Sequence, residues 1–496
     1  MLTKHKILAV AIACLLTGCA IVPDYIRPQT SLPEKFLNQT AVEQSPARVK
    51  AELTSWWAGF EDPLLTQYIT NALEQNLDLA LASARMEQTR AGLGSANAAL
   101  LPSVNVNAQA AKSHQSVETP LGKVLNSKPG YDRNGNAYEV NLGAIWEIDL
   151  FGGLKHGRDA ALADYQASEA GTIATRLAVT AQTADIYITI RGLQSRLDVA
   201  RRQVQTEQDL LSKINLLHRH GLAAELQVRQ AEGALAQLQA SIPMLEAGLE
   251  TAMNAMDVML GTPAGTHRAQ LRQASAIPVA PKISDIGSPA ELLRRRPDLI
   301  VAERRLAASN ARIGAAVAEY YPKFSIGGFI GSATTVSAGN VFSSGANQAA
   351  GFLGLRWRLF DFGRIDAQIA QAKGQEAEML AAYRLAALRA TEEVENAFSS
   401  WIKREQQAAV LSQGIDSLSR ARSVSFAAYE KGIVSLIEVL QADENLLRAS
   451  DAKTQAQIES SRAAVAAFRA LGGGWLPPAS GARVTERTVT ENHSPT

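Results

Sequence analysis

The sequence predicts a chain of mixed α and β structure that is mostly α-helical. Three observations predict this fold class. The two halves share their motifs, each half contains a helical stretch too long for a globular core, and each half contains two segments that alternate apolar and polar residues. The 496 residues carry 49 Lys and Arg against 48 Asp and Glu, which argues against a dedicated nucleic-acid binder. After residue 20, no apolar run reaches the ~18 residues of a membrane-spanning helix.

Two constant spacings relate the halves of the chain. Motifs that precede the alternating segments recur 220 residues later, Asp78-Leu79 as Asp298-Leu299 and Leu101-Pro102 as Tyr321-Pro322. Motifs that follow them recur 211 residues later, Trp146–Gly152 as Trp357–Gly363 and Gly221 as Gly432. The difference between the spacings places a length difference in one loop, so the sequence predicts an internal two-fold repeat.

Each half follows the same plan. An alanine-rich amphipathic stretch (63–100 and 290–320) precedes a pair of strands, and a very long helical stretch follows (153–218 and 364–430). Asp62-Pro63 is a helix start signal, with Asp as N-cap. Some 65 helical residues extend on the order of 100 Å, so these helices are expected to pack side by side as coiled coils.

The expected domains follow from this plan. They are a signal peptide (1–18), an extended N-terminal segment (19–62), a first repeat (63–261), a proline-containing linker with room for a short strand (262–289), a second repeat (290–471) and a C-terminal tail (472–496).

The N-terminus resembles the signal of a bacterial lipoprotein. Basic Lys4 to Lys6 precede an apolar run that is too short to span a membrane. Leu16-Thr17-Gly18-Cys19 resembles a lipobox, so we expect a covalent lipid on Cys19 and no other cofactor. In the lipoproteins that this segment resembles, an aspartate directly after the cysteine often signals retention in the inner membrane, so the resemblance implies that Ala20 favours the outer membrane. The alternative is an ordinary signal peptide with a coincidental cysteine.

Four segments read as β-strands with one apolar and one polar face. They are 104–110, 138–150, 324–332 and 352–359. This alternation is typical of outer-membrane strands, and the aromatic residues at the strand ends suit an interfacial girdle. These residues are Phe151, Tyr320, Tyr321, Trp357, Phe360 and Phe362. The alternative is a soluble sandwich with one solvated face.

Four strands are too few to close a barrel. An open sheet in hydrocarbon would leave unpaired backbone groups, and closure needs about eight strands. A dimer would give eight strands and a filled interior, whereas a trimer would give twelve strands and room for a channel. A monomeric pore is therefore excluded.

Several segments are similar to the outer-membrane efflux proteins, the TolC-like exit ducts, and specifically to their lipoprotein branch. These segments are Val22–Pro28, Trp56–Leu64, Trp146–Gly152, Leu292–Leu299 with Ala302-Glu303, and Ala470–Trp475. The resemblance implies a homotrimer, with a twelve-stranded β-barrel in the outer membrane continuous with an α-helical barrel in the periplasm.

The resemblance also implies partners and a function. Such a duct receives drugs or other toxic compounds from an inner-membrane pump, expected to be of the proton-driven RND type, through a periplasmic adaptor protein. It contacts outer-membrane lipid, binds no nucleic acid and is not an enzyme.

Two glycine breaks between long helices are candidate adaptor contacts. By resemblance, the tips containing Gly221 and Leu222, and Gly432, Ile433 and Val434, meet the adaptor. The alternative is that these residues only cap each other within the duct.

At the position of the family's periplasmic gate, this sequence departs from the family pattern. The family often carries an aspartate just after the second tip, where this chain has Gln441, and the repeat partner of that position is Gln230. Ile437 is a candidate apolar constriction, and Glu438 and Asp443 are candidate acidic lining. All of these positions could equally be solvated faces of coiled coils.

No catalytic motif is present. The sequence contains no HExxH, Walker or G-x-S-x-G pattern. Arg294 to Arg296 are interpreted as a solvated face. The functional alternatives are a structural coiled-coil lipoprotein without a channel and, far behind it, a lipoprotein hydrolase.

Overall fold

The computed structural model describes residues 25–29, 33–44 and 49–476. Cys19, the expected signal peptide and most of the expected tail lie outside the described residues. The chain forms two compact units, and each unit takes segments from both halves of the sequence. Among the described residues, the sheet unit contains residues 25–29, 86–168 and 302–383, and the helical unit contains residues 33–44, 49–85, 169–301 and 384–476.

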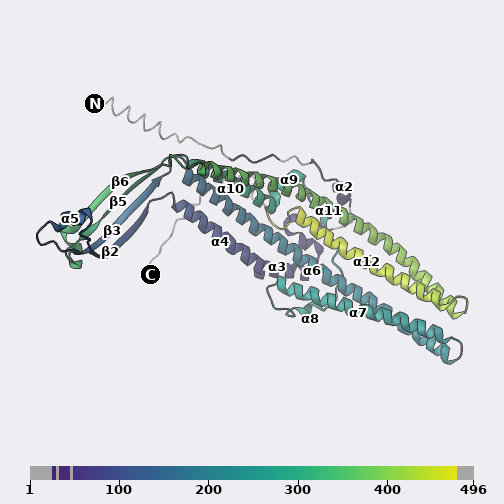
Figure 1. Ribbon diagram of the computed structural model, residues 1–496. Helices are drawn as coiled ribbons and strands as arrows, with labels where there is room; N and C mark the ends of the chain where they lie inside the picture. Colours follow the sequence, from purple (N-terminus) through teal and green to yellow (C-terminus); the bar gives the residue numbers. More distant parts are fainter. Residues whose placement is uncertain (1–24, 30–32, 45–48, 477–496) are drawn as a thin grey trace, which may run out of the picture. The chain divides into compact units, whose positions relative to one another are not determined.

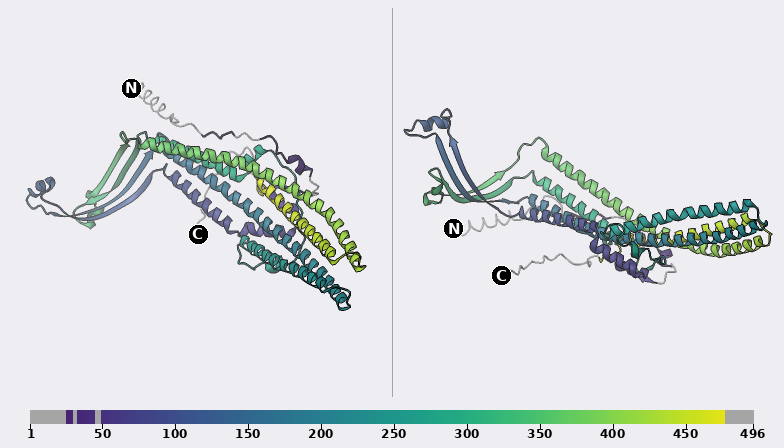
Figure 2. Two further views of the ribbon diagram at one scale, coloured as in Figure 1. Left: turned by 45° about the vertical axis from the view of Figure 1, so that its right-hand side comes forward. Right: turned by 90° about the horizontal axis from the view of Figure 1, so that it is seen from below.

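The described residues are mostly helical, as predicted. The principal helices are α3 (Pro63–Gln75), α4 (Leu77–Ala98), α6 (Gly153–Arg219), α7 (Glu225–Met259), α9 (Pro289–Arg295), α10 (Pro297–Ala318), α11 (Arg364–Glu430) and α12 (Leu436–Ala470). The shorter ones are α2 (Gln39–Glu43), α5 (Pro120–Asn126), α8 (Arg268–Leu271), η1 (Leu53–Phe60), η2 (Ala338–Phe342) and η3 (Ser344–Ala346). Helices α6 and α11 have 67 residues each, and α7 and α12 have 35 each. In the ribbon views, α6 turns back as α7 and α11 turns back as α12 (Figures 1 and 2).

The alanine-rich stretch 63–100 forms two helices instead of a continuous one. Asp62 caps α3 as predicted, and its Oδ1 accepts from the N–H groups of Leu64 (2.9 Å) and Leu65 (3.0 Å). Asn76 then adopts an extended conformation and ends α3. Its side-chain oxygen accepts from the N–H of Asp78 (2.9 Å) at the start of α4. The sequence pattern missed this break because alanine suits both helices equally well.

The second half is broken at the corresponding place, at Arg296 between α9 and α10. The interpretation of Arg294 to Arg296 as a solvated face is wrong for Arg296, which is only 7% exposed. Its guanidinium pairs with Asp298 (2.7 Å) and Glu393 (2.8 Å) and donates to the carbonyl of Ala470 (3.2 Å). Buried charges are retained when they are paired and hydrogen-bonded in this way.

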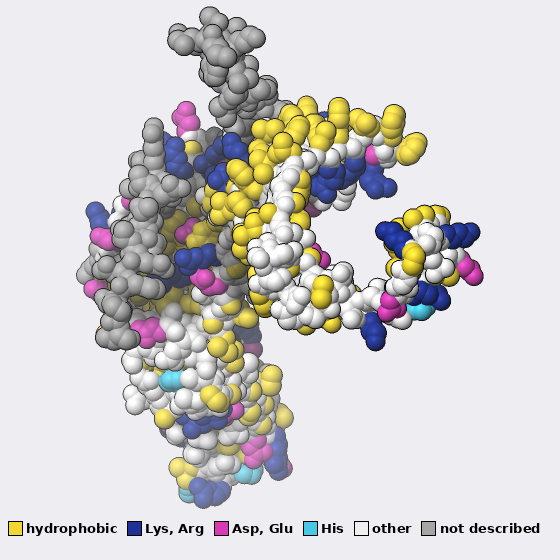
Figure 3. Space-filling model, turned by 90° about the vertical axis from the view of Figure 1, so that its left-hand side faces the viewer, with side chains coloured by type: hydrophobic (Ala, Val, Ile, Leu, Met, Phe, Trp, Pro, Cys, Tyr) yellow, Lys and Arg dark blue, Asp and Glu magenta, His cyan; other side chains and the backbone are white. Residues whose placement is uncertain are grey.

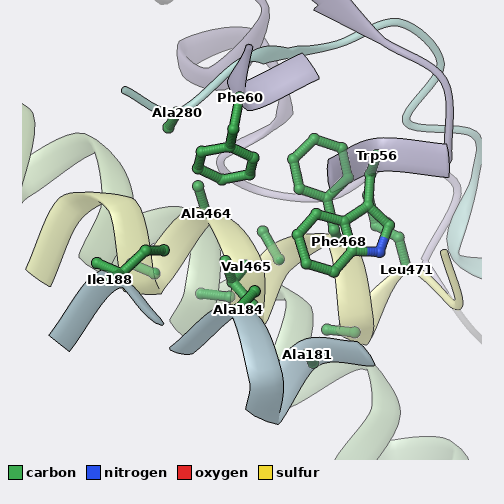
Figure 4. Packing of buried hydrophobic residues seen from close by; sticks show 14 of the residues in the cluster. Trp56, Phe60, Ala181, Ala184, Ile188, Ala280, Ala464, Val465, Phe468 and Leu471 are labelled. Carbon is green, nitrogen blue, oxygen red and sulfur yellow. The ribbon is translucent and has the colours of Figure 1, made fainter. Parts of the chain in front are cut away.

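The core of the helical unit forms where η1 packs on α12 and α6 (Figure 4). Trp56 stacks on Phe468, with ring centroids 5.4 Å apart and an interplanar angle of 10°. Alanines on the facing helices, such as Ala184 and Ala464, are fully buried and allow close approach of their backbones. Strands β1 (Lys50–Ala51) and β4 (Lys282–Ile283) pair in parallel, which joins the N-terminal segment to the linker.

The sheet unit contains a four-stranded antiparallel sheet in the order β2-β3-β5-β6. The strands are β2 (Ser103–His114), β3 (Asn134–Ile148), β5 (Lys323–Thr334) and β6 (Asn347–Arg356). The pairing keeps the two predicted faces separate, because Val106 lies opposite Leu142 and Asn107 lies opposite Asn141. The expectation that the last strand includes Trp357 and Leu359 is wrong for the single chain, because β6 ends at Arg356.

One face of this sheet is apolar and exposed. Val106 is 67% exposed, Ile330 61% and Leu353 82%, and hydrophobic side chains gather along the outer side of the curved sheet (Figure 3). The other face is polar at its far end, where the side-chain amide of Gln348 donates to Asn141 Oδ1 (2.9 Å) and to Glu139 Oε1 (3.1 Å). Apolar side chains left exposed on this scale mark a surface that contacts a partner or a membrane.

Within the described ranges, none of the helices combines the length and the apolar character needed to cross a membrane.

Pairs of contacts recur at the spacings seen in the sequence. In the helical unit, Asn76 Nδ2 donates to the carbonyl of Met259 (2.9 Å), as Arg296 does to that of Ala470. In the sheet unit, the indole N–H of Trp146 donates to the carbonyl of Leu100 (2.9 Å), and that of Trp357 donates to the carbonyl of Tyr320 (2.9 Å). In each case the first residues differ by 220 or 211 positions, as the sequence motifs do.

Candidate functional site

Two glycine turns form the tips of the long helical hairpins. Gly221 (φ +73°) joins α6 to α7, and Gly432 (φ +72°) joins α11 to α12. Both turns close in the same way. The N–H of Leu222 donates to the carbonyl of Leu217 (2.9 Å), and the N–H of Ile433 donates to that of Ala428 (2.9 Å). This left-handed helix ending favours glycine, because in other L-residues the Cβ atom would lie too close to a backbone carbonyl oxygen.

The residue after each glycine presents an apolar side chain to solvent. Leu222 is 74% exposed and Ile433 is 73% exposed, whereas Val434 is half-buried. A Cβ placed on either glycine would meet no atom within 4 Å among the described residues. The tips are therefore open surfaces with one exposed aliphatic residue each, a composition suited to a protein contact.

The four gate candidates separate into three environments. Ile437 and Gln441 on α12 line a groove of about 980 Å³ in the helical unit, and Gln230 on α7 lines the same groove. Glu438 is exposed on α12 and does not line the groove. The structure therefore brings Gln441 and its repeat partner Gln230 to one groove.

Asp443, the fourth candidate, is buried beside this groove. It is 1% exposed, and its Oδ1 accepts from Arg422 Nε on α11 at 2.8 Å. Its Oδ2 has no hydrogen-bond partner among the described residues. Asp443 thus pairs across the α11–α12 hairpin, and its carboxylate is shielded from solvent within the chain.

A second acid that the sequence did not single out faces this pair. Glu207 on α6 is 2% exposed. Burial and then the negative charge of Asp443 raise the pKa of Glu207 from 4.5 to about 7. The side-chain amide of Gln203, and more weakly the charge of Arg422, act in the opposite direction. The half-buried guanidinium of Arg422 thus lies close to two buried carboxylates, which cannot both be ionised at low cost.

Sequence reasoning missed Glu207 and Arg422 because no local pattern connects them. Glu207 on α6 and Arg422 on α11 lie more than 200 positions apart in the sequence, and Asp443 lies on a third helix, α12. Next to this acid cluster, the apolar residues Leu210, Ile214, Leu436 and Val439 pack together. Lys213 and Arg422 both lie over the ring of Phe426, at 4.2 and 5.4 Å from its centroid.

Within the described part of the chain, no group of three or more His, Cys, Asp or Glu side chains could hold a metal ion. The site features are therefore tips, a groove and a buried acid cluster.

Comparison with known proteins gives consistent matches over nearly the whole chain. A model of the family described as outer membrane efflux protein matches residues 68–262 and 289–473. The pyoverdine export outer membrane protein OpmQ of Pseudomonas putida is 31% identical, over 87% of this chain and 91% of the relative. Outer membrane protein OprJ of Pseudomonas aeruginosa is 30% identical, over 94% and 95%. The solved structure of the outer-membrane channel OprN has a TM-score of 0.83 at 31% identity, covering 92% of this chain and all of that one.

Proposed function

The chain belongs to the outer membrane efflux protein family and is an efflux protein of the outer membrane, and we propose that it is the exit duct of a tripartite efflux system. Members of the family are transporters and not enzymes. In this proposal three copies form a passive channel. The channel exports drugs or other toxic small molecules that an inner-membrane pump delivers through a periplasmic adaptor protein.

The observation that carries the proposal is the four-stranded sheet, whose two edges are unpaired among the described residues. Strands β2 and β6 are its outer strands, and each has a strand on one side only. In hydrocarbon, each unpaired N–H or C=O group costs several kcal/mol, so the sheet needs further strands. Three copies would supply twelve strands in one closed barrel, with the polar face around Glu139, Asn141 and Gln348 lining a water-filled interior.

We also infer that the chain is an internal two-fold repeat. The matching bonds of Trp146 and Trp357, and of Asn76 and Arg296, support this inference. With two similar halves per chain, a trimer would place six similar structural repeats around its axis.

The anchor and the partners complete the proposal. We infer that Cys19 carries a covalent lipid and that the helices extend into the periplasm. The exposed Leu222 and Ile433 at the tips would contact the adaptor, with an RND-type pump below it. A relative named for pyoverdine export supports a small-molecule cargo without fixing which molecule this chain exports.

A gate at the groove remains part of this proposal. Ile437 and Gln441, with Gln230 opposite, would line the narrow part of the duct, and Glu438 would lie outside it. Asp443 would act through its ion pair with Arg422, because its carboxylate is buried in the chain.

The alternative is a structural coiled-coil lipoprotein without channel activity. Such a protein needs no polar sheet face, whereas here Gln348 bonds to both Glu139 and Asn141 across strands. These groups suit a solvated interior better than a dry contact.

Two measurements test the proposal. Native mass spectrometry of the detergent-extracted protein is expected to show a trimer with one lipidated Cys19 per chain, and the purified trimer is expected to conduct ions in a planar bilayer. A dimer or a water-soluble monomer would contradict the duct. A lipidated oligomer that never conducts, from a gene whose deletion changes no drug sensitivity, would favour the structural alternative.

A further inference from the structure

We propose that Glu207 and Asp443 form a proton-binding site that joins the α6–α7 hairpin to the α11–α12 hairpin and opens as the pH rises above neutrality. In this site, neutral Glu207 donates through Oε2 to Asp443 Oδ2, while Asp443 stays ionised beside Arg422. The proton depends on the helical unit alone. Its effect on conduction rests on the proposed duct.

The first support is a pair of buried carboxyl oxygens that lack donors. Glu207 is 2% exposed and Asp443 is 1% exposed. Within the described ranges, neither Oε2 of Glu207 nor Oδ2 of Asp443 has a hydrogen-bond partner. A buried polar atom is costly unless it is hydrogen-bonded. A proton on one of the two acids supplies the missing donor, because a protonated carboxyl group carries one O–H.

The other two oxygens decide which acid holds the proton. Asp443 Oδ1 accepts from Arg422 Nε at 2.8 Å, so the ion pair belongs to Asp443. Glu207 Oε1 accepts from the neutral side-chain amide of Gln203 at 3.4 Å. Burial and then the charge of Asp443 raise the pKa of Glu207 to about 7. Glu207 is therefore the acid that carries the proton.

The other cations beside Glu207 are already paired. The groove that Glu207 lines also contains two arginines, one on α6 and one on α12. Arg196 pairs with Asp451, with Nε and Oδ1 2.7 Å apart. Arg448 pairs with Glu444. Among the described residues, α7 lines the groove with amide, hydroxyl and apolar side chains. Arg422 thus remains the cation that both buried acids share.

The site connects the two hairpins close to their tips. Glu207 belongs to α6 and lies 14 positions before Gly221. Asp443 belongs to α12 and lies 11 positions after Gly432. At 1.5 Å per residue, each acid lies on the order of 20 Å from its tip. A bond between them therefore fixes the end of one hairpin against the end of the other.

Loss of the proton weakens this connection. Above pH 7 Glu207 ionises, and two buried carboxylates share the guanidinium of Arg422. Like charges at close range repel, and a buried charge without a partner is costly. The Lys213–Glu430 pair between α6 and α11 is exposed, so it contributes little to holding the hairpins together. The hairpins are therefore expected to separate at this level.

The proton reaches the site through the groove. Glu207 lines the groove of about 980 Å³ together with Ile437 and Gln441. Water in the groove gives the proton to Glu207 and takes it back as the pH changes. Separation of α12 from α6 at this level also moves the segment that carries Ile437 and Gln441. The proton site thus controls the position of these two side chains.

Infrared spectroscopy of the purified protein measures the proton directly. A protonated carboxyl group has a C=O stretching band that a carboxylate lacks. We expect the parent protein to show such a band at pH 6 and the variant Glu207→Gln to lack it. With a midpoint at about pH 7, Glu207 is about 90% protonated at pH 6 and about 10% protonated at pH 8. Absence of the band from the parent protein at pH 6 would overturn the site.

The variant Asp443→Asn tests the partner of Glu207. It removes the negative neighbour and leaves Arg422 to pair with Glu207, so the midpoint of the band should move from about 7 toward 4.5. The matched control is Glu444→Gln at the exposed next position of α12, which should keep the midpoint near 7. An unchanged midpoint in Asp443→Asn would overturn the pairing of the two acids.

Conduction in a planar bilayer measures the consequence for the duct. Trimers of the parent protein are expected to conduct more at pH 8 than at pH 6, with a midpoint near 7. Glu207→Gln, which stays neutral, is expected to lose this rise. Equal conduction by the parent protein at both pH values would overturn the role of the proton in joining the hairpins. A protein that forms no conducting trimer would overturn the duct, while the infrared band would still decide the proton site.

Discussion

Glu207 is buried, and among the described residues its carboxylate forms no ion pair. Close to it, Asp443 Oδ1 accepts a hydrogen bond from Arg422 Nε at 2.8 Å. The charges of both Asp443 and Arg422 act on the pKa of Glu207. Because burial and the Asp443 charge raise the pKa of Glu207 to about 7, the folded chain keeps a proton that the unfolded chain releases above about pH 4.5. The stability that this group contributes is fully present below that pH and is lost as the pH rises through 7.

Replacing Glu207 by Gln is expected to remove this loss. Near pH 5 the variant and the parent protein should unfold at similar temperatures. Near pH 8 Glu207→Gln should be more stable, by on the order of 1–3 kcal/mol. Thermal unfolding followed by circular dichroism at both pH values measures this difference.

The exposed Glu444→Gln on α12 serves as the control and should leave the pH dependence unchanged. An unaltered pH dependence in Glu207→Gln would show that Glu207 is ionised in the folded chain at all of these pH values.

Arg296 is the second residue whose role depends on burial. Its guanidinium bonds to Asp298, Glu393 and the carbonyl of Ala470. Removing one partner of a buried ion pair costs about 3–5 kcal/mol, so Arg296→Ala should lower the free energy of unfolding of the helical unit by that amount. Arg294→Ala, at an exposed position two residues earlier, should change it by less than about 0.5 kcal/mol. Denaturant titration of both variants measures this difference. Equal effects would contradict a stabilising role for the buried contacts of Arg296 with Asp298, Glu393 and Ala470.

At the scale of elements, the sheet assigns opposite environments to alternate residues of one strand. On β6, Leu353 is 82% exposed on the apolar face, whereas Gln348 bonds to Glu139 and Asn141 on the polar face. The alternation was readable in the sequence because strand side chains have a period of two. Which polar residues of different strands contact each other depends on the register of the strands, which the structure supplies.

A positive charge should therefore be tolerated on only one face. Leu353→Arg is expected to cost about 2–4 kcal/mol of membrane stability if the residue lies near the bilayer midplane. Its folded fraction in outer membranes should fall accordingly. Gln348→Arg, which faces Glu139, should insert normally. Urea unfolding in lipid vesicles compares the two variants, and a normal Leu353→Arg protein would argue that this face does not contact lipid.

At the scale of the whole molecule, the proposed duct works only if its tips dock with a partner. Gly432→Val forces a β-branched residue into a left-handed conformation, at a cost of about 1–2 kcal/mol at the tip. We expect the Gly432→Val protein to form a trimer of normal mass. Cells that carry this variant are expected to be as drug-sensitive as a deletion strain. Gly432→Asn, a residue that tolerates this conformation, should retain efflux. Full efflux by the valine variant would exclude docking through this tip.

Many features of this protein were predictable from the sequence. The helix start at Asp62, the two glycine tips, the four strands with their faces and the mostly helical fold follow from period, spacing and local backbone preference. Gly221 and Gly432 were identifiable because only a few residues suit a left-handed helix end. The family resemblance followed from motifs spread along the chain.

Other features required the tertiary structure. Asn76 and Arg296 break helices that alanine-rich periodicity would continue, because each one also bonds to a carbonyl from a distant helix end. Glu207, Arg422 and Asp443 come from three helices and have no common local signal. The sequence by itself determined the repeat spacing, the faces and the turns, since these depend on neighbours along the chain. Only the tertiary structure decided which charges are buried together and where β6 ends, because burial and strand pairing depend on which distant segments lie alongside.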